Sequence, residues 1–206
     1  MKITALVIST IVLVLSINSV NAGVNIFGSY NNILKASTSG TAFTPGPTAF
    51  TQTDTIGSGI AVGAEYFDKF SESLGFFVGG SYEPARTITK SDNSISGVST
   101  ASSPQPTIQV MTLYGNIAFY FSPQIYISGG LNYSMPSYTR GSSGNLNATL
   151  SSAMGAQLGV GYMINEQWSV EGVARGLFAG LTAPGTTTYT NYLLNDLLIK
   201  IKYQLF

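Results

Sequence analysis

The last ten residues of the chain, LLIKIKYQLF at positions 197–206, alternate between two kinds of side chain. The apolar positions are Leu197, Ile199, Ile201, Tyr203 and Leu205. Between them lie Lys200, Lys202 and Gln204. Because successive side chains of a β-strand point to opposite faces, the segment predicts a strand with one apolar and one cationic face.

The two lysines distinguish between two kinds of barrel. A soluble carrier barrel of the lipocalin type predicts apolar residues inside and polar residues outside. A transmembrane barrel predicts the reverse, a polar lumen and a lipid-facing apolar exterior. Lys200 and Lys202 alternate with Ile199 and Ile201, which fits the second arrangement and favours a transmembrane barrel.

Seven further segments alternate at period two, and after residue 22 none sustains a helical pattern over three turns. They lie at 24–34, 57–67, 74–86, 108–121, 125–135, 150–162 and 168–178. With the terminal segment, they predict an all-β protein of eight strands.

The links between these segments alternate in length. Those at 68–73, 122–124 and 165–167 are short, whereas the others are long and rich in Ser, Thr, Gly, Asn and Pro, as at 37–55 and 87–106. Outer-membrane barrels have short periplasmic turns, longer extracellular loops and an even number of strands. The pattern therefore predicts an eight-stranded antiparallel up-and-down transmembrane β-barrel with four long extracellular loops.

Aromatic residues gather next to the expected short turns. They are Tyr66, Phe67, Phe70, Phe76, Phe119, Phe121, Tyr162, Trp168 and Tyr203. Aromatic side chains are enriched at both membrane–water interfaces. We therefore expect a periplasmic aromatic girdle formed chiefly by Tyr66, Phe119, Tyr162, Trp168 and Tyr203.

The N-terminus predicts a signal peptide at residues 1–22. Lys2 is followed by an apolar run at 5–17 and then by small residues that end at Ala22. The run is short for a membrane-spanning helix, and its small-residue ending is typical of a signal peptidase site. We expect cleavage after Ala22, export to the bacterial outer membrane, and one barrel domain at 23–206.

These features resemble the small OmpA/OmpX-type outer-membrane β-barrel superfamily through the N-terminal segment, the eight segments, the alternating links and the terminal Phe206. The resemblance covers residues 23–206 and rests on pattern. It implies contact with outer-membrane lipid and lipopolysaccharide, and recognition of the C-terminal strand by the barrel-assembly machinery. The chain departs from the family pattern in one respect, because Phe206 is out of phase with Tyr203.

Two residues of common catalytic chemistry, histidine and cysteine, are missing from the sequence. The chain has no histidine, which removes the base of a Ser–His arrangement and the commonest transition-metal ligand. It has no cysteine, and its nine basic and nine acidic residues form no basic patch. The Gly-x-Gly repeats at 57–63 and 159–161 fall inside expected strands, where they suit close packing. We expect no enzymatic activity, cofactor, metal site or nucleic-acid partner.

Ionisable residues at inward positions form the candidate site. These candidate lumen charges are Glu65, Glu83, Glu171, Arg175, Asp196 and Lys200, with Lys202 as a further member. A register that pairs Glu171 with Lys200 also pairs Arg175 with Asp196, and it places Trp168 beside Tyr203. An eight-stranded barrel is just wide enough for its side chains, so such charges must be paired or hydrated.

Three roles for the lumen remain open. Paired charges would fill it, whereas unpaired charges could line a narrow porin-like path for ions or small solutes. Inward Phe27, Phe77 and Leu177 also allow a carrier of small hydrophobic ligands. We expect a non-enzymatic barrel with a structural or surface-interaction role through its extracellular loops, whose composition identifies no partner.

Overall fold

The computed structural model describes residues 22–43, 47–95, 98–100, 107–139, 149–150, 152–182 and 190–205. The strands in these ranges are β1 Gly23–Phe43, β2 Pro47–Ile56, β3 Gly59–Lys69, β4 Leu74–Ile95, β5 Val98–Thr100, β6 Thr107–Tyr120, β7 Ile125–Thr139, β8 Thr149–Leu150, β9 Ala153–Met163, β10 Trp168–Thr182 and β11 Thr190–Gln204. Within the same ranges, no helix is long and apolar enough to cross a bilayer.

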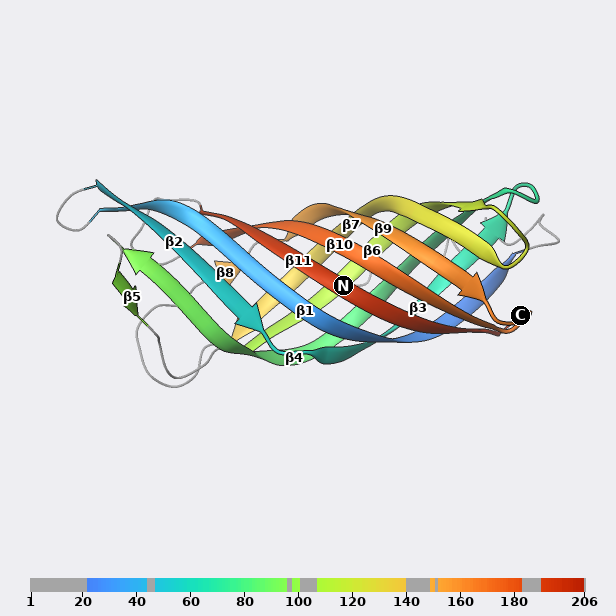
Figure 1. Ribbon diagram of the computed structural model, residues 1–206, viewed down its shortest axis with the longest axis horizontal. Helices are drawn as coiled ribbons and strands as arrows, with labels where there is room; N and C mark the ends of the chain where they lie inside the picture. Colours follow the sequence, from blue (N-terminus) through green and yellow to red (C-terminus); the bar gives the residue numbers. More distant parts are fainter. Residues whose placement is uncertain are drawn as a thin grey trace, which may run out of the picture.

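The strands close into an antiparallel barrel with eight wall strands (Figure 1). Each wall strand pairs with its neighbours along the chain, and β11 closes the barrel by pairing with both β10 and β1. β2 and β3 share the second wall position, because both pair with β1 and β4. β8 and β9 share the sixth, since both pair with β10. The expected eight-stranded barrel is confirmed, and β5 is an additional strand paired with the end of β4.

The first two expected loops consist largely of strand, so the prediction of a loop at 37–55 is wrong. β1 continues to Phe43 and pairs with β2 from Pro47 onward. β4 likewise continues to Ile95, where β5 pairs with it. The Thr-rich sequence favours extended backbone, and outside a bilayer neither face of a strand must be apolar, so pairing continues where alternation stops. Of the third and fourth expected loops, which follow residues 135 and 178, residues 140–148 and 183–189 lie outside the described residues.

The three short links are tight turns with one shared hydrogen-bond pattern, at the end of the barrel where the C-terminus lies (Figure 1). In each turn, one side-chain oxygen accepts hydrogen bonds from the backbone N–H groups two and three residues ahead. The distances are 3.3 and 3.1 Å for Ser71, 3.3 and 3.1 Å for Ser122, and 2.9 and 2.8 Å for Asn165. Ser and Asn side chains support chain reversal in this way.

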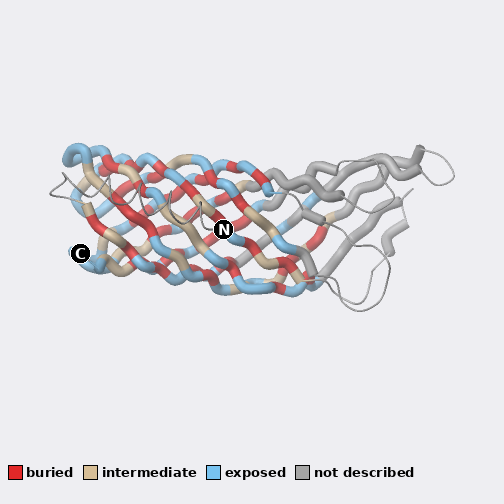
Figure 2. The backbone as a smooth tube through the Cα atoms, turned by 180° about the vertical axis from the view of Figure 1, so that it is seen from behind, coloured by how far each residue is buried: buried red, intermediate tan, exposed pale blue. Residues whose placement is uncertain are grey.

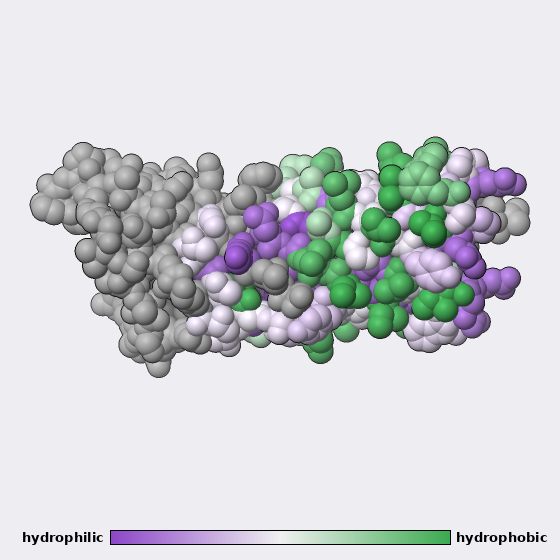
Figure 3. Space-filling model, viewed as in Figure 1, coloured by the Kyte–Doolittle hydropathy of each residue, from purple (hydrophilic) through white to green (hydrophobic). Residues whose placement is uncertain are grey.

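Buried and exposed residues alternate along the wall strands (Figure 2). The exposed ones are largely apolar, and most described charged residues of the wall are buried inside. In β11, Ile199 and Ile201 are 50% and 55% exposed, whereas Lys200 and Lys202 are 4% and 1% exposed. On the face shown in Figure 3, the exposed apolar residues form a band next to the polar end that carries the short turns. This arrangement is the reverse of a soluble carrier barrel.

Glycines in the wall make room for large inward side chains. A Cβ at Gly161 would overlap the ring of Tyr126, and a Cβ at Gly63 would overlap the ring of Phe27. Both glycines belong to the Gly-x-Gly repeats seen in the sequence. The repeats therefore serve close packing inside a narrow barrel.

Candidate functional site

The lumen next to the short turns is filled by aromatic rings. This aromatic plug consists of Phe67, Phe77, Ala118, Tyr120 and Tyr126, with Met163 packed against it. The ring centroids of Phe77 and Tyr120 lie 5.4 and 5.3 Å from that of Tyr126. A recess at this end has a volume of about 20 Å³, which is room for roughly one water molecule.

Beyond the plug lies the turn-side network, in which Lys202 forms ion pairs with carboxylates from two other strands. The Nζ atom of Lys202 lies 2.7 Å from Oε1 of Glu65 in β3 and 2.7 Å from Oε2 of Glu171 in β10. The Tyr114 hydroxyl and the Asn25 amide donate hydrogen bonds to Glu65 at 2.7 and 3.1 Å. The carboxylate of Glu65 is therefore neutralised and hydrogen-bonded on both oxygens, as a buried charge requires.

Lys200 is the less closely paired cation of the turn-side network. Its Nζ atom lies 3.8 Å from Oε2 of Glu171, whose other oxygen accepts a hydrogen bond from Ser128 at 2.7 Å. The same ammonium lies 4.4 Å from the ring centroid of Tyr114 and 5.0 Å from that of Phe27. Aromatic faces attract cations. The ammonium of Lys200 is therefore stabilised by two aromatic rings as well as by the carboxylate of Glu171.

The loop-side network lies farther from the short turns and centres on Arg175 in β10. Its NH2 group donates to Glu83 in β4 and to Asp196 in β11, the latter at 2.5 Å. Arg86 and Asn31 donate to the second oxygen of Glu83 at 2.7 and 2.8 Å. These charge-assisted bonds join β1, β4, β10 and β11 across the lumen.

All six candidate lumen charges and Lys202 are at most 5% exposed. The β10–β11 ladder pairs Glu171 with Lys200, Arg175 with Asp196, and Trp168 with Tyr203. Other charge contacts join strands that are not ladder partners, from Glu65 to Lys202 and from Glu83 to Arg175. Among the described residues, no group of three His, Cys, Asp or Glu is placed to hold a metal ion.

Arg86 is a lumen residue that alternation did not predict, because a bulge interrupts β4. Strict alternation places residues 83 and 86 on opposite faces, but the β4–β6 register shifts between them. Pro84 lies in the shift, and proline within a strand commonly marks a bulge. Pro84 was therefore the available signal. The uncharged network members Asn25, Asn31, Tyr114 and Ser128 carried no comparable signal.

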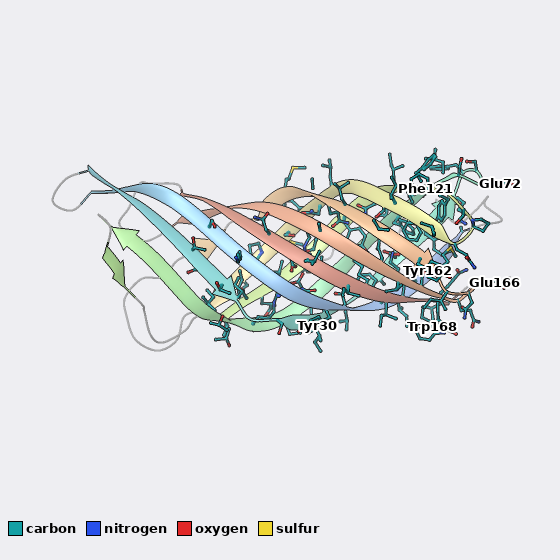
Figure 4. All side chains as sticks on the ribbon, in the orientation of Figure 1. Tyr30, Glu72, Phe121, Tyr162, Glu166 and Trp168 are labelled. Carbon is teal, nitrogen blue, oxygen red and sulfur yellow. The ribbon has the colours of Figure 1, made fainter. Side chains whose placement is uncertain are left out.

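All five expected girdle residues lie on the outward face of the barrel near the short turns, and all but Tyr66 are at least partly exposed. Phe119, Tyr162 and Trp168 are exposed, and the Trp168 ring centroid lies 4.8 Å from that of Tyr203. Figure 4 shows Tyr162 and Trp168 near this end and Tyr30 farther along the barrel. Tyr30 is exposed as well, so aromatic residues lie toward both edges of the apolar surface.

Two aromatic residues depart from the expected girdle. Tyr66 is only 6% exposed, and its ring packs against Phe76 at a centroid distance of 5.8 Å. Phe67 faces inward and belongs to the aromatic plug. Tyr66 shares the outward face with its ladder partner Val78 and is covered there, whereas Phe67 is the next residue along the strand and therefore points into the lumen.

A closed eight-stranded barrel with an apolar exterior and a filled, charged lumen defines the class of small transmembrane barrels. Comparison with solved structures agrees. The structure is similar to the outer membrane protein OprG from Pseudomonas aeruginosa, with a TM-score of 0.53, 13% identity, and coverage of 91% of this chain and 98% of that chain.

Two further solved structures are similar over most of their length. Neisserial surface protein A has a TM-score of 0.49 and 14% identity, with 89% of this chain and 99% of that chain covered. The outer membrane protease OmpT from Escherichia coli has a TM-score of 0.49 and 8% identity, with 92% and 99% covered. Neither a protein-family model nor a curated protein sequence matches the chain. The closed barrel and the similarity to OprG together give the chain the fold of the small outer-membrane barrels.

Proposed function

We propose that the protein is a non-enzymatic outer-membrane barrel with a structural or surface-interaction role through its extracellular loops. The filled lumen carries this proposal. Two ion networks and an aromatic plug occupy the interior one above the other, and the recess at the turn end has a volume of about 20 Å³. A barrel of this kind offers its outer surface and its loops to partners.

The paired lumen charges favour a sealed barrel rather than a narrow channel. A permeating ion needs hydrated or unpaired groups along its path, but Lys202 and Arg175 each contact two carboxylates. Displacing these partners would leave buried charges uncompensated, which costs several kcal/mol. The ion pairs therefore act as fixed parts of the wall packing.

The inward aromatic residues that the structure describes favour a packing role rather than a ligand-binding role. Phe77 is part of the aromatic plug, and Phe27 lies beneath the ammonium of Lys200. Both are at most 5% exposed. The side chain of Leu177 lies outside the described residues. The absence of histidine from the sequence also argues against a histidine-dependent hydrolase on this scaffold.

The proposal includes the expected route to the membrane. Residues 1–22 would direct export, and the strand that ends in YQLF would be recognised by the barrel-assembly machinery. In the membrane, the apolar band would contact lipid, and lipopolysaccharide would surround the loop side. β1 begins at Gly23, immediately after the expected cleavage site, which supports this division of the chain.

Single-channel conductance of the refolded barrel in planar bilayers tests the proposal. We expect no steady conductance, because the ion networks and the plug occupy the lumen in the part of the barrel that the structure describes. The variant Phe77→Ala/Tyr126→Ala removes two rings of the plug. Its matched control is Tyr126→Phe, which keeps both rings. Heat-dependent gel mobility verifies folding of each protein. Steady ion-selective steps in the unmodified barrel would overturn the sealed-lumen proposal and favour the narrow channel.

A further inference from the structure

A polar patch interrupts the outside of the barrel above the apolar band. The Lys35 patch consists of the outward residues Lys35 and Ser37 in β1, Thr53 and Thr55 in β2, and Asn195 in β11. The ladders place Lys35 directly between Asn195 and Thr55. The backbone of Lys90 in β4 pairs with that of Thr55 and extends the row by one strand. Figure 3 shows hydrophilic surface on this face, where the apolar band ends.

The height of Lys35 on the wall matches the far edge of a membrane. Ile26 in β1 pairs with Tyr203, which marks the turn-side girdle. Lys35 lies nine residues beyond Ile26, with one register shift between them. At about 3.3 Å per residue and a strand tilt of roughly 40°, Lys35 lies about 20 Å above the girdle. Because the apolar band of such barrels is about 25 Å tall, its flexible side chain can reach the headgroups.

The chemistry of the patch suits an anion. It offers one ammonium, three hydroxyls and an amide, and its members include no carboxylate. The neighbouring acids Asp54 and Asp196 are instead buried on the lumen side. Among the described residues, no carboxylate forms an ion pair with Lys35. A cation at the edge of an apolar band is stabilised when a headgroup anion neutralises it.

We propose that the Lys35 patch binds the phosphate group of a glycolipid headgroup in the outer leaflet. The ammonium of Lys35 contacts the phosphate, while the hydroxyls and the amide donate to sugar or phosphate oxygens. This inference rests on the proposed outer-membrane location, with the loop side facing outward. It assigns a lipid-binding site to the outer wall, away from the lumen and the loop tips.

The test measures lipid retention by the purified barrel with native mass spectrometry. The probes are lipid A and the same lipid after removal of its phosphates. The proteins are the unmodified barrel, Lys35→Gln, Lys35→Arg, and the matched control Lys69→Gln, which makes the same charge change at the turn end of β3. We expect Lys35→Gln to retain about five-fold less lipid A. Lys35→Arg and Lys69→Gln should match the unmodified barrel, and the dephosphorylated lipid should bind all four weakly.

Two results would overturn the inference. One is equal retention of lipid A by Lys35→Gln and the unmodified barrel, and the other is retention that does not depend on phosphate. Heat-dependent gel mobility verifies that every variant is folded. Membrane fractionation separates this result from the proposed function: absence of the chain from the outer membrane contradicts the proposed location, whereas loss of phosphate-dependent retention contradicts only the lipid site.

Discussion

Lys202 and Lys200 occupy the same face of one strand but have different surroundings. Lys202 contacts two carboxylates at 2.7 Å, whereas Lys200 lies 3.8 Å from its only described carboxylate partner. The alternation of β11 predicted that both would face inward, but it did not predict their contacts. Their contacts depend on which residues of other strands lie at the same height along the barrel axis. Strand tilt and stagger determine these heights.

Replacing Lys202 by methionine should lower the free energy of unfolding by about 3–5 kcal/mol, because Glu65 and Glu171 would both lose their closest cation. Lys200→Met is the matched control and should cost less. Urea unfolding in detergent or lipid can be followed by the fluorescence of Trp168, the one tryptophan of the chain. Removing one acid as well, in Lys202→Met/Glu65→Gln, should recover part of the loss, because Glu171 then stays as the partner of Lys200. Equal losses for the two lysine variants would contradict the central role of Lys202.

At the scale of the element, the tight turns were the most predictable feature. The short links at 68–73, 122–124 and 165–167 were recognisable from length and composition, and each contains a Ser or Asn that accepts backbone hydrogen bonds. The far ends of β1, β2 and β4 were not predictable from alternation, because both faces of these segments are polar. Alternation reports burial on one face, so it detects a strand only where the two environments differ.

Asn165→Ala should destabilise the barrel by about 1–2 kcal/mol, because the backbone N–H groups of Gln167 and Trp168 lose their acceptor. Asn165→Ser should cost much less, since Ser71 and Ser122 serve the equivalent turns. The change lies beside Trp168, so its fluorescence during urea unfolding measures the effect directly. An alanine variant as stable as the serine variant would show that this side-chain acceptor does not stabilise the turn.

At the scale of the whole molecule, strand number, up-and-down order and the inverted distribution of polarity all followed from the sequence. The register of β10 against β11 also followed, because two charge pairs and one aromatic pair share one alignment. The bulge at Pro84 and the paired extension of β1 and β2 did not follow. A bulge changes the phase of the alternation between apolar and polar residues. The polar extensions of the strands have no such alternation. Neither feature therefore leaves a period-two signal in the sequence.

The chain recovered from outer-membrane fractions should begin at Gly23. This residue is the first of β1 and pairs with Phe67, so the wall strand starts directly after the expected cleavage site. N-terminal sequencing measures the cleavage site. Ala22→Leu should accumulate the uncleaved precursor, whereas Ala22→Ser should be processed, because the peptidase requires a small residue there. A membrane-inserted chain that still begins at Met1 would contradict the expected signal peptide.

Closure of the barrel between the first and last wall strands determines how the interior can form. β1 supplies Asn25 and Asn31 to the two networks, and β11 supplies Lys202 and Asp196. While the sheet is open, these groups face water separately. Closure brings them together and removes the water in one event, and a partly closed sheet would hold dehydrated charges without partners. The pairing of β1 with β11 should therefore form cooperatively. An intermediate in which only part of this pairing has formed would be the least stable state along the assembly path.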